Sequence, residues 1–295
     1  MSFNLIRIEQ LKREEVLGIL KLARNIESET RKYFGILNHK MLGILFFQPS
    51  TRTRIGFSVA MQNLGGGVVY LYDTKFTKGM SARESLEDTV RVIGDYCDVL
   101  CIRHSIESTL EKVCRSTHVP IINCGNGTDQ HPTQALIDLY TIWKEFGRLD
   151  NLRLAVIGDL KHMRTAHSLI LGLSLFRGNK LKLISPKELR LPDKYLKRVE
   201  DSLEISETDM VELRDEDVVY VAGLPPFGKG NERLRYQIDK RKALQLKEGA
   251  IILNPLPRVD EITREVDSLR CARYFEQSKN GLYVRMAILT KILRG

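Results

Sequence analysis

The chain has 295 residues, 43% of them hydrophobic and 28% charged, and an excess of 46 Lys and Arg over 37 Asp and Glu gives a formal net charge of +9. This composition is globular and excludes a disordered, collagen-like or low-complexity chain. No run approaches the roughly 20 apolar residues of a membrane helix, and the first residues lack the apolar segment of a signal peptide. We therefore expect a soluble, cytoplasmic protein with no membrane partner.

Short apolar segments, typical of strands, alternate along the chain with longer amphipathic segments, typical of helices. Continuous apolar strands between helices indicate parallel sheets covered on both faces. We predict an α/β protein of two domains, each a mainly parallel sheet flanked by helices, with four strands in each sheet. The expected strands are 41–47, 67–72, 99–104, 120–125, 152–158, 181–185, 217–223 and 250–256, and the expected helices are 53–64, 85–95, 106–116, 132–146, 164–176, 187–202, 231–246 and 281–293.

The length favours two domains over one. The helix expected at 132–146, followed by a polar turn, is the natural joint between the two sets of strands. We place the boundary near residue 140, which predicts domains over 1–140 and 141–295. A C-terminal helix at about 277–295 is a candidate to pack back on the first domain.

The five cysteines are odd in number, scattered and partly inside apolar runs. This pattern favours buried reduced thiols over a disulfide framework or a zinc site. The positive charge is compatible with nucleic acid, with an anionic small molecule or with solubility alone. We expect no nucleic-acid partner, because the basic residues are spread over the chain and the dense stretch 233–247 alternates with apolar residues, as on the exposed face of a helix.

The turn after the first strand carries the clearest signal for a binding site. Ligands of open α/β sheets bind at the carboxyl ends of strands, and here Ser50, Thr51, Arg52, Thr53 and Arg54 lead from a strand into a helix. A helix start offers unpaired N–H groups and a positive dipole end. An ordinary helix cap would explain one hydroxyl but not the arginine pair. The turn therefore predicts a phosphate site without the glycines or lysine of a Walker motif.

Two further strand ends supply hydrogen-bond donors. Arg103 ends the third strand, and the loop after the fourth strand leads to His131 and Gln134 at the start of a helix. A single histidine before a helix is usually structural, but together with the phosphate turn these side chains suit the polarisation of a carbonyl group. The loops hold no paired carboxylates and no Cys/His set, which disfavours metal-assisted hydrolysis.

The order of motifs resembles the aspartate/ornithine carbamoyltransferase family over almost the whole chain, and within it most closely the catalytic chains of aspartate carbamoyltransferases. The motifs are FFQPSTRTRIGFSVAMQNLGG, IRH, GNGTDQHPTQALIDLYTI, GDLKHMRTAHSL, NPLPRVDEITREVD and YFEQSKNGLYVRMAIL. The resemblance implies a carbamoyltransferase, usually a homotrimer with sites shared between subunits, that needs no metal or organic cofactor. It also implies that the first domain binds carbamoyl phosphate and the second binds the amine acceptor.

The resemblance assigns roles to individual residues. Thr53, Arg103 and His131 would polarise the carbonyl oxygen and are the predicted catalytic residues. The carbamoyl phosphate site would comprise Ser50, Thr51, Arg52, Thr53, Arg103, His131, Gln134, Pro255 and Leu256. The second substrate would contact Arg164, Thr165, Leu224 and Pro257, and further candidates are Lys78, Arg83 and Arg285.

Three departures from the family pattern affect the acceptor half. Ala82 stands where a neighbouring subunit's lysine belongs, and the sequence leaves open whether Lys78 or Arg83 replaces it. Gly223 and Pro225 stand where an arginine and a glutamine read the second carboxylate of aspartate. Asn254 stands where the HPLP motif has histidine.

From these departures we expect a carbamoyltransferase whose acceptor is a small carboxylate-bearing amine other than L-aspartate. One alternative is a true aspartate carbamoyltransferase, with Arg233, Arg235 or a displaced loop replacing the lost contacts. Another is a non-catalytic relative that binds carbamoyl phosphate or a partner subunit. The complete set of oxyanion donors counts against this second alternative, and the missing loop lysine counts for it.

Overall fold

The computed structural model describes residues 3–71, 84–224 and 234–294. They form two α/β units, one made of residues 1–133 and 281–295 and the other of residues 134–280. Each unit contains one parallel sheet flanked by helices, so the predicted fold class is confirmed. The division falls at residues 133/134, a few residues before the boundary expected near 140.

The sheet of the first unit has four strands in the order β2-β1-β3-β4, and all neighbours are parallel. The central strands β1 (Met41–Phe46) and β3 (Val99–His104) are apolar and almost wholly buried, whereas β2 (Gly67–Leu71) lies at an edge. The fourth strand is β4 (Ile121–Asn126). The carboxyl ends of β1 and β3 are neighbours, since the N–H of Phe47 donates to the carbonyl of Arg103 at 2.8 Å.

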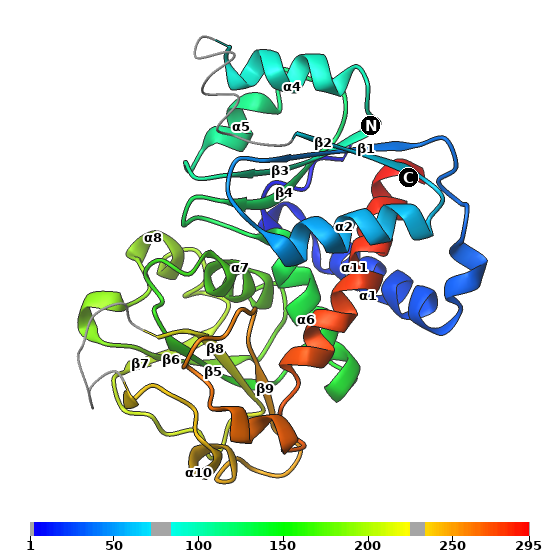
Figure 1. Ribbon diagram of the computed structural model, residues 1–295. Helices are drawn as coiled ribbons and strands as arrows, with labels where there is room; N and C mark the ends of the chain where they lie inside the picture. The colour runs from blue at the N-terminus through cyan, green and yellow to red at the C-terminus, as the bar shows by residue number, and fades with distance from the viewer. Residues whose placement is uncertain (1–2, 72–83, 225–233, 295) are drawn as a thin grey trace. The chain divides into compact units, whose positions relative to one another are not determined.

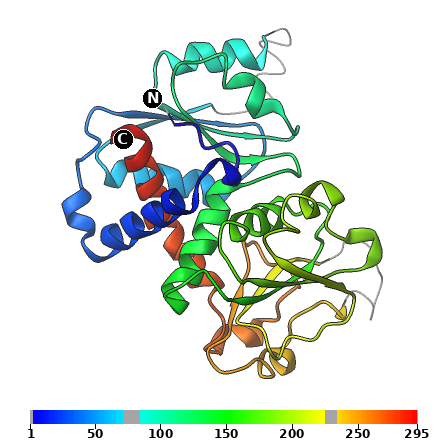
Figure 2. The same cartoon turned by 180° about the vertical axis from the view of Figure 1, so that it is seen from behind.

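Helices cover both faces of this sheet (Figures 1 and 2). One face carries α4 (Leu86–Gly94) and α5 (Thr109–Val113), whose buried apolar side chains pack on strand residues in one cluster. The opposite face carries α1 (Arg13–Ser28) and α2 (Thr51–Asn63). Two short 3-10 helices, η1 (Ile8–Gln10) and η2 (Thr30–Tyr33), flank α1.

The sheet of the second unit has five parallel strands in the order β7-β6-β5-β8-β9, one more than predicted. The additional strand is the edge strand β7, which carries mostly polar, exposed side chains and so lacks an apolar signal in the sequence. The strands are β5 (Arg153–Gly158), β6 (Lys180–Ile184), β7 (Glu204–Thr208), β8 (Val218–Gly223) and β9 (Ile251–Leu253).

The helices that position the site in the second unit are α6, α7 and α11. Helices α6 and α11 are held together by side-chain bonds, among them one from Nδ2 of Asn280 to Oγ1 of Thr141 at 3.0 Å. The helices are α6 (Pro132–Phe146), α7 (Arg164–Leu173), α8 (Asp193–Leu196), α10 (Lys240–Ala243) and α11 (Tyr274–Arg294), with 3-10 helices η3 (Lys187–Leu189) and η4 (Arg264–Ser268).

Several predicted helices are wrong in extent. The helix expected at 187–202 is two short pieces, η3 and α8, because Pro192 stands between them and disfavours a continuous helix. Of the helix expected at 231–246, residues 235–246 contain only α10, which begins after the Asp239 cap, and Ile238 forms a bridge with Ile262. Helix α1 was not predicted. No helix in the described ranges is long and apolar enough to cross a membrane.

Candidate active site

The turn after β1 leads directly into α2, which begins at Thr51. Ser50 occupies the N-cap position in an extended conformation, and its side chain makes no capping hydrogen bond. The first turn of α2 contains no acidic residue, and Thr53 is buried with 6% of its surface exposed. Neither the cap residue nor an acidic side chain of the first turn therefore occupies the first backbone N–H groups of the helix, as a site for an anion requires.

Near this turn, the positive charge of Arg52 repels the charges of two other guanidinium groups of the first unit, those of Arg103 and Arg285. Arg52 lies at the start of α2, Arg103 at the end of β3, and Arg285 in α11. Burial lowers the pKa of Arg103 and lowers the pKa of Arg285 to about 10, and repulsion by Arg52 lowers both further. Within the described residues none of the three pairs with a carboxylate. This concentration of uncompensated positive charge favours a multiply charged anion.

Arg285 is lodged against α2 with only 6% of its surface exposed. A Cβ at Gly56 would lie 2.6 Å from Nη1 of Arg285, so the guanidinium occupies the space that glycine leaves. Its charge also lies 5.6 Å from the ring of Phe57. Nε of Arg285 and Nε of Arg103 are buried without a hydrogen-bond partner in the described part of the chain, while Nη1 of Arg103 donates to the carbonyl of Cys124 at 2.9 Å.

The segment between β4 and α6 holds His131, which is 5% exposed. The hydroxyl of Thr133 lies 3.1 Å from Nδ1 of His131. A hydroxyl that donates to Nδ1 fixes the ring proton on Nε2, which is then a neutral hydrogen-bond donor. Gln134 follows in the first turn of α6, and its Nε2 donates to Oδ1 of Asp138 at 2.7 Å.

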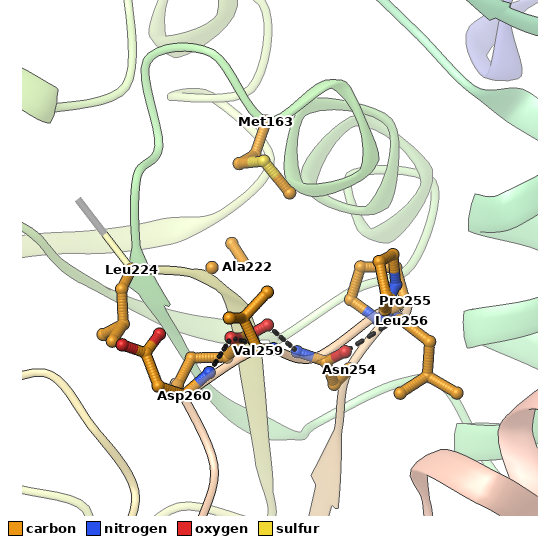
Figure 3. A pocket seen from close by; sticks show the side chains of 11 residues that line it. Met163, Ala222, Leu224, Asn254, Pro255, Leu256, Val259 and Asp260 are labelled. Atoms are coloured by element: carbon orange, nitrogen blue, oxygen red, sulfur yellow. Dashed lines mark hydrogen bonds between the residues drawn. The ribbon is translucent and has the colours of Figure 1, made fainter. Parts of the chain in front are cut away.

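In the second unit, a cavity of about 230 Å³ lies at the carboxyl ends of β8 and β9 (Figure 3). It is lined by three of the predicted site residues that follow β9 and by one that follows β8, namely Pro255, Leu256, Pro257 and Leu224. Met163 points into it from the residue before α7. Strand ends form this cavity, as expected for an α/β sheet.

Asn254 holds the loop after β9 in shape. Its Oδ1 accepts the N–H of Leu256 at 2.7 Å (Figure 3). Its Nδ2 donates to the carbonyl of Val221 at 2.9 Å. Leu256 has a φ of +51°, which is unfavourable for a residue with a Cβ. The asparagine at the position of the family's histidine is therefore a loop-supporting residue.

Arg164 and Thr165 begin α7, whose first turn contains no acidic residue. Arg164 is half-buried, and Thr165 is 8% exposed. The helix start and the arginine suit a carboxylate.

The position of Gly223 is constrained by the backbone. Gly223 has a φ of +127°, and its carbonyl lies 1.8 Å from where a Cβ of Gly158 would be. The carbonyl also accepts the N–H of Asp159 at 3.1 Å. The close approach of β5 and β8 therefore requires glycine at position 158, whereas glycine at position 223 is favoured by its positive φ, since a Cβ there would make only ordinary contacts with Met163. Arg235 pairs with Asp209 at 3.5 Å. The predicted positions that lie outside the described residues are Lys78, Ala82, Arg83, Pro225 and Arg233.

Sequence reasoning missed the buried polar residues behind the loop after β9. Asp138, Tyr220 and Gln277 are at most 1% exposed, and burial raises the pKa of Asp138 to about 7. The available signal was an acidic residue inside the apolar stretch ALIDLY of α6. The described residues contain no group of three or more His, Cys, Asp or Glu side chains that could hold a metal ion.

The structure combines parallel sheets, a positively charged helix start suited to an anion, and a cavity at the ends of β8 and β9. This combination is typical of enzymes that act on phosphorylated substrates. Residues 4–144 match the family model for the carbamoyl-P binding domain of aspartate/ornithine carbamoyltransferases, and residues 150–292 match that for the Asp/Orn binding domain. The chain belongs to this family, and it is a carbamoyltransferase.

Its relatives include aspartate carbamoyltransferase catalytic subunits. The protein of Methanococcus maripaludis is 44% identical over 97% of this chain and 96% of the relative, and that of Archaeoglobus fulgidus is 44% identical over 99% and 100%. Among solved structures, the catalytic subunit of the M. jannaschii aspartate transcarbamoylase has a TM-score of 0.91 and 41% identity, covering 100% of this chain and 98% of its own. The Trypanosoma cruzi aspartate transcarbamoylase, in complex with carbamoyl phosphate and aspartate, has a TM-score of 0.89 and 32% identity, covering 98% and 95%.

These relatives overturn the expectation that the acceptor is an amine other than L-aspartate. Full-length relatives at 44% identity carry the name aspartate carbamoyltransferase, which favours the alternative of a true aspartate carbamoyltransferase. The expectation rested on Gly223 and Pro225 as lost side-chain contacts, but the positive φ of Gly223 favours glycine there whatever the acceptor is.

Proposed function

We propose that the protein transfers the carbamoyl group of carbamoyl phosphate to the amino group of L-aspartate and releases phosphate. The names of the relatives support this acceptor, and the T. cruzi structure contains both substrates. The strongest support from this chain itself is the group of three guanidiniums beside the start of α2, where the N-cap side chain makes no hydrogen bond.

The phosphate of the substrate would bind at the start of α2. The backbone N–H groups and hydroxyls of Ser50, Thr51 and Thr53 supply hydrogen bonds, and Arg52 and Arg103 supply charge. We add Arg285 as the buried third cation, because its charge is uncompensated within the described residues and acts on Arg52. A dianion relieves the mutual repulsion of these groups, which favours binding of carbamoyl phosphate before the acceptor.

The transfer itself requires stabilisation of a tetrahedral oxyanion. We assign this role to Thr53, Arg103 and His131. The neutral amine attacks the carbonyl carbon, the intermediate collapses with phosphate leaving, and no protein nucleophile is required. Positioning would come from Gln134 on the carbamoyl nitrogen and from the backbone of Pro255 and Leu256.

For the acceptor, Arg164 and Thr165 at the start of α7 are the proposed ligands of a carboxylate, and Leu224 and Pro257 are proposed to line the pocket. The family resemblance also supports a cytoplasmic homotrimer in which Lys78 or Arg83 of one subunit serves the site of its neighbour. Light scattering tests the trimer, and a fully active monomer at micromolar concentration would contradict shared sites.

Steady-state kinetics test the proposed reaction. Phosphate release is measured with carbamoyl phosphate and L-aspartate, and with L-ornithine as the control acceptor. We expect kcat/KM for L-aspartate at or above about 10⁴ M⁻¹s⁻¹, in the ordinary range of enzymes. Turnover with L-ornithine but not with L-aspartate, or with neither, would refute the proposal.

A further inference from the structure

A buried polar network in the second unit is centred on Asp138 of α6. Its Oδ1 accepts hydrogen bonds from Nε2 of Gln134 at 2.7 Å and from Nε2 of Gln277 at 2.6 Å. The buried hydroxyl of Tyr220 interacts electrostatically with this carboxylate but makes no hydrogen bond within the described residues. Asp138 is 0% exposed, and no cation of the described chain pairs with it. A buried carboxylate without a cation is costly, so a role beyond stability is indicated.

The first branch of the network fixes the orientation of Gln134. Because Nε2 of this amide donates to Asp138, its carbonyl Oε1 is left to accept a hydrogen bond elsewhere. The flipped amide would place its oxygen against the carboxylate oxygen at a hydrogen-bond distance, which is repulsive. An acceptor oxygen is what the –NH₂ of a carbamoyl group requires, whereas a donor would repel it.

The second branch reaches the loop after β9. Gln277 donates to Asp138 through Nε2, and its Oε1 accepts the N–H of Asn254 at 2.9 Å. Asn254 in turn accepts the N–H of Leu256, the residue with the positive φ. One carboxylate oxygen thus holds a side chain in α6 and, through Gln277, the backbone that follows β9.

The contact between α6 and α11 does not depend on Asp138 alone. One turn further along both helices, Oγ1 of Thr141 accepts a hydrogen bond from Asn280 at 3.0 Å. Nζ of Lys144 also pairs with Glu276 at 2.9 Å. The Asn280–Thr141 bond joins the same two helices and involves neither Gln134 nor the loop after β9. It provides a matched control for a purely structural role.

We propose that Asp138 is a positioning residue for carbamoyl transfer, which fixes the acceptor face of Gln134 and, through Gln277 and Asn254, the loop that ends at Leu256. This inference rests on the proposed function, since it takes the partner of Gln134 to be the carbamoyl nitrogen. The property that matters is an acceptor oxygen at the position of Oδ1. The carboxylate charge is not required, so an amide at this position preserves the arrangement.

The test compares three variants with the wild-type enzyme. Asp138→Asn keeps an acceptor oxygen, Asp138→Leu removes it, and Thr141→Val removes the neighbouring bond between the same helices. Affinities for carbamoyl phosphate and for inorganic phosphate are measured by calorimetry, and kcat and KM are measured with L-aspartate. Phosphate is the internal control, because it lacks the –NH₂ group that Gln134 would hold.

We expect Asp138→Leu to weaken the affinity for carbamoyl phosphate about tenfold and to lower kcat about ten- to a hundredfold, while the affinity for phosphate stays unchanged. Asp138→Asn and Thr141→Val should stay within about threefold of wild type in all these quantities. If Asp138→Leu does not fold, Asp138→Ser, whose side chain is too short to reach Gln134, replaces it with the same expected losses.

An equal loss of affinity for phosphate and carbamoyl phosphate, or a loss in Thr141→Val that matches that of Asp138→Leu, would overturn the inference in favour of a structural role. Wild-type activity with L-aspartate and an unaffected Asp138→Leu would also overturn it while leaving the proposed function intact. An inactive wild type would instead refute the proposed function.

Discussion

Replacement of Arg285 by methionine separates the stability of the chain from its affinity for phosphate. Burial lowers the pKa of Arg285 to about 10, which corresponds to about 3 kcal/mol of unfavourable free energy for the charged form at neutral pH. Contact with the ring of Phe57 offsets about 1 kcal/mol of this. Methionine fills a similar volume without charge, so Arg285→Met should stabilise the unliganded protein by about 2 kcal/mol and raise its Tm by about 4 °C.

The same variant should bind phosphate less tightly. In the wild type, inorganic phosphate relieves the repulsion among Arg52, Arg103 and Arg285 and should raise the Tm. At a saturating concentration this stabilisation is expected to be smaller in Arg285→Met by about 1.4 kcal/mol or more, equivalent to a tenfold weaker Kd. Differential scanning calorimetry with and without phosphate measures both effects.

Arg24→Met, which alters an exposed arginine of α1, is the control and should change neither quantity. A variant at Arg285 that is less stable than the wild type without phosphate, and that gains the same Tm from phosphate, would refute the reasoning. Arg285 would then be a structural cation rather than part of an anion site.

Three further predictions follow from single contacts. Arg52→Ala should weaken the affinity for carbamoyl phosphate by about tenfold or more, as measured by calorimetric titration without an acceptor. An unchanged affinity would exclude this turn from the site. Gly56→Ala should leave α2 at least as stable but displace Arg285, raising KM for carbamoyl phosphate several-fold; unchanged kinetics would contradict the packing. Asp138 is protonated in the folded chain up to a pKa of about 7 but ionises near pH 4 when unfolded, so wild-type stability should fall as pH rises between these values. Between pH 5 and pH 8, the free energy of unfolding of Asp138→Asn should rise by about 2 to 3 kcal/mol relative to that of the wild type. Parallel pH profiles of the two proteins would show that Asp138 does not titrate in this range.

The strand-to-helix turn proposed to bind phosphate could be located from the sequence because its signal is local, and its role stays a prediction. The hydroxyls and arginines from Ser50 to Arg54 follow one another after an apolar strand, and β1 and α2 place this turn at the carboxyl end of the sheet. The two parallel sheets were predictable for the same reason, since central strands such as β5 are continuous apolar runs. The polar edge strand β7 carries no such run and was missed.

The roles of Asp138 and Gly223 depend on tertiary contacts. Asp138 meets Gln277 across 139 residues of sequence, and nothing near either residue indicates the partner. Gly223 was interpreted as a missing specificity residue, but its φ of +127° is a backbone constraint that favours glycine. A comparison of side chains alone cannot distinguish a lost ligand from a position that needs glycine.

The central claim, transfer of a carbamoyl group to L-aspartate at the cationic site, is tested most directly by following the transferred atom. The protein is incubated with carbamoyl phosphate labelled with ¹³C at the carbonyl carbon and with L-aspartate, and the products are resolved by NMR spectroscopy. The account predicts that the label appears in N-carbamoyl-L-aspartate at the rate of phosphate release, and that Arg52→Ala strongly slows both. Label that stays in carbamoyl phosphate and its spontaneous breakdown products, at the rate of a protein-free control, would contradict it.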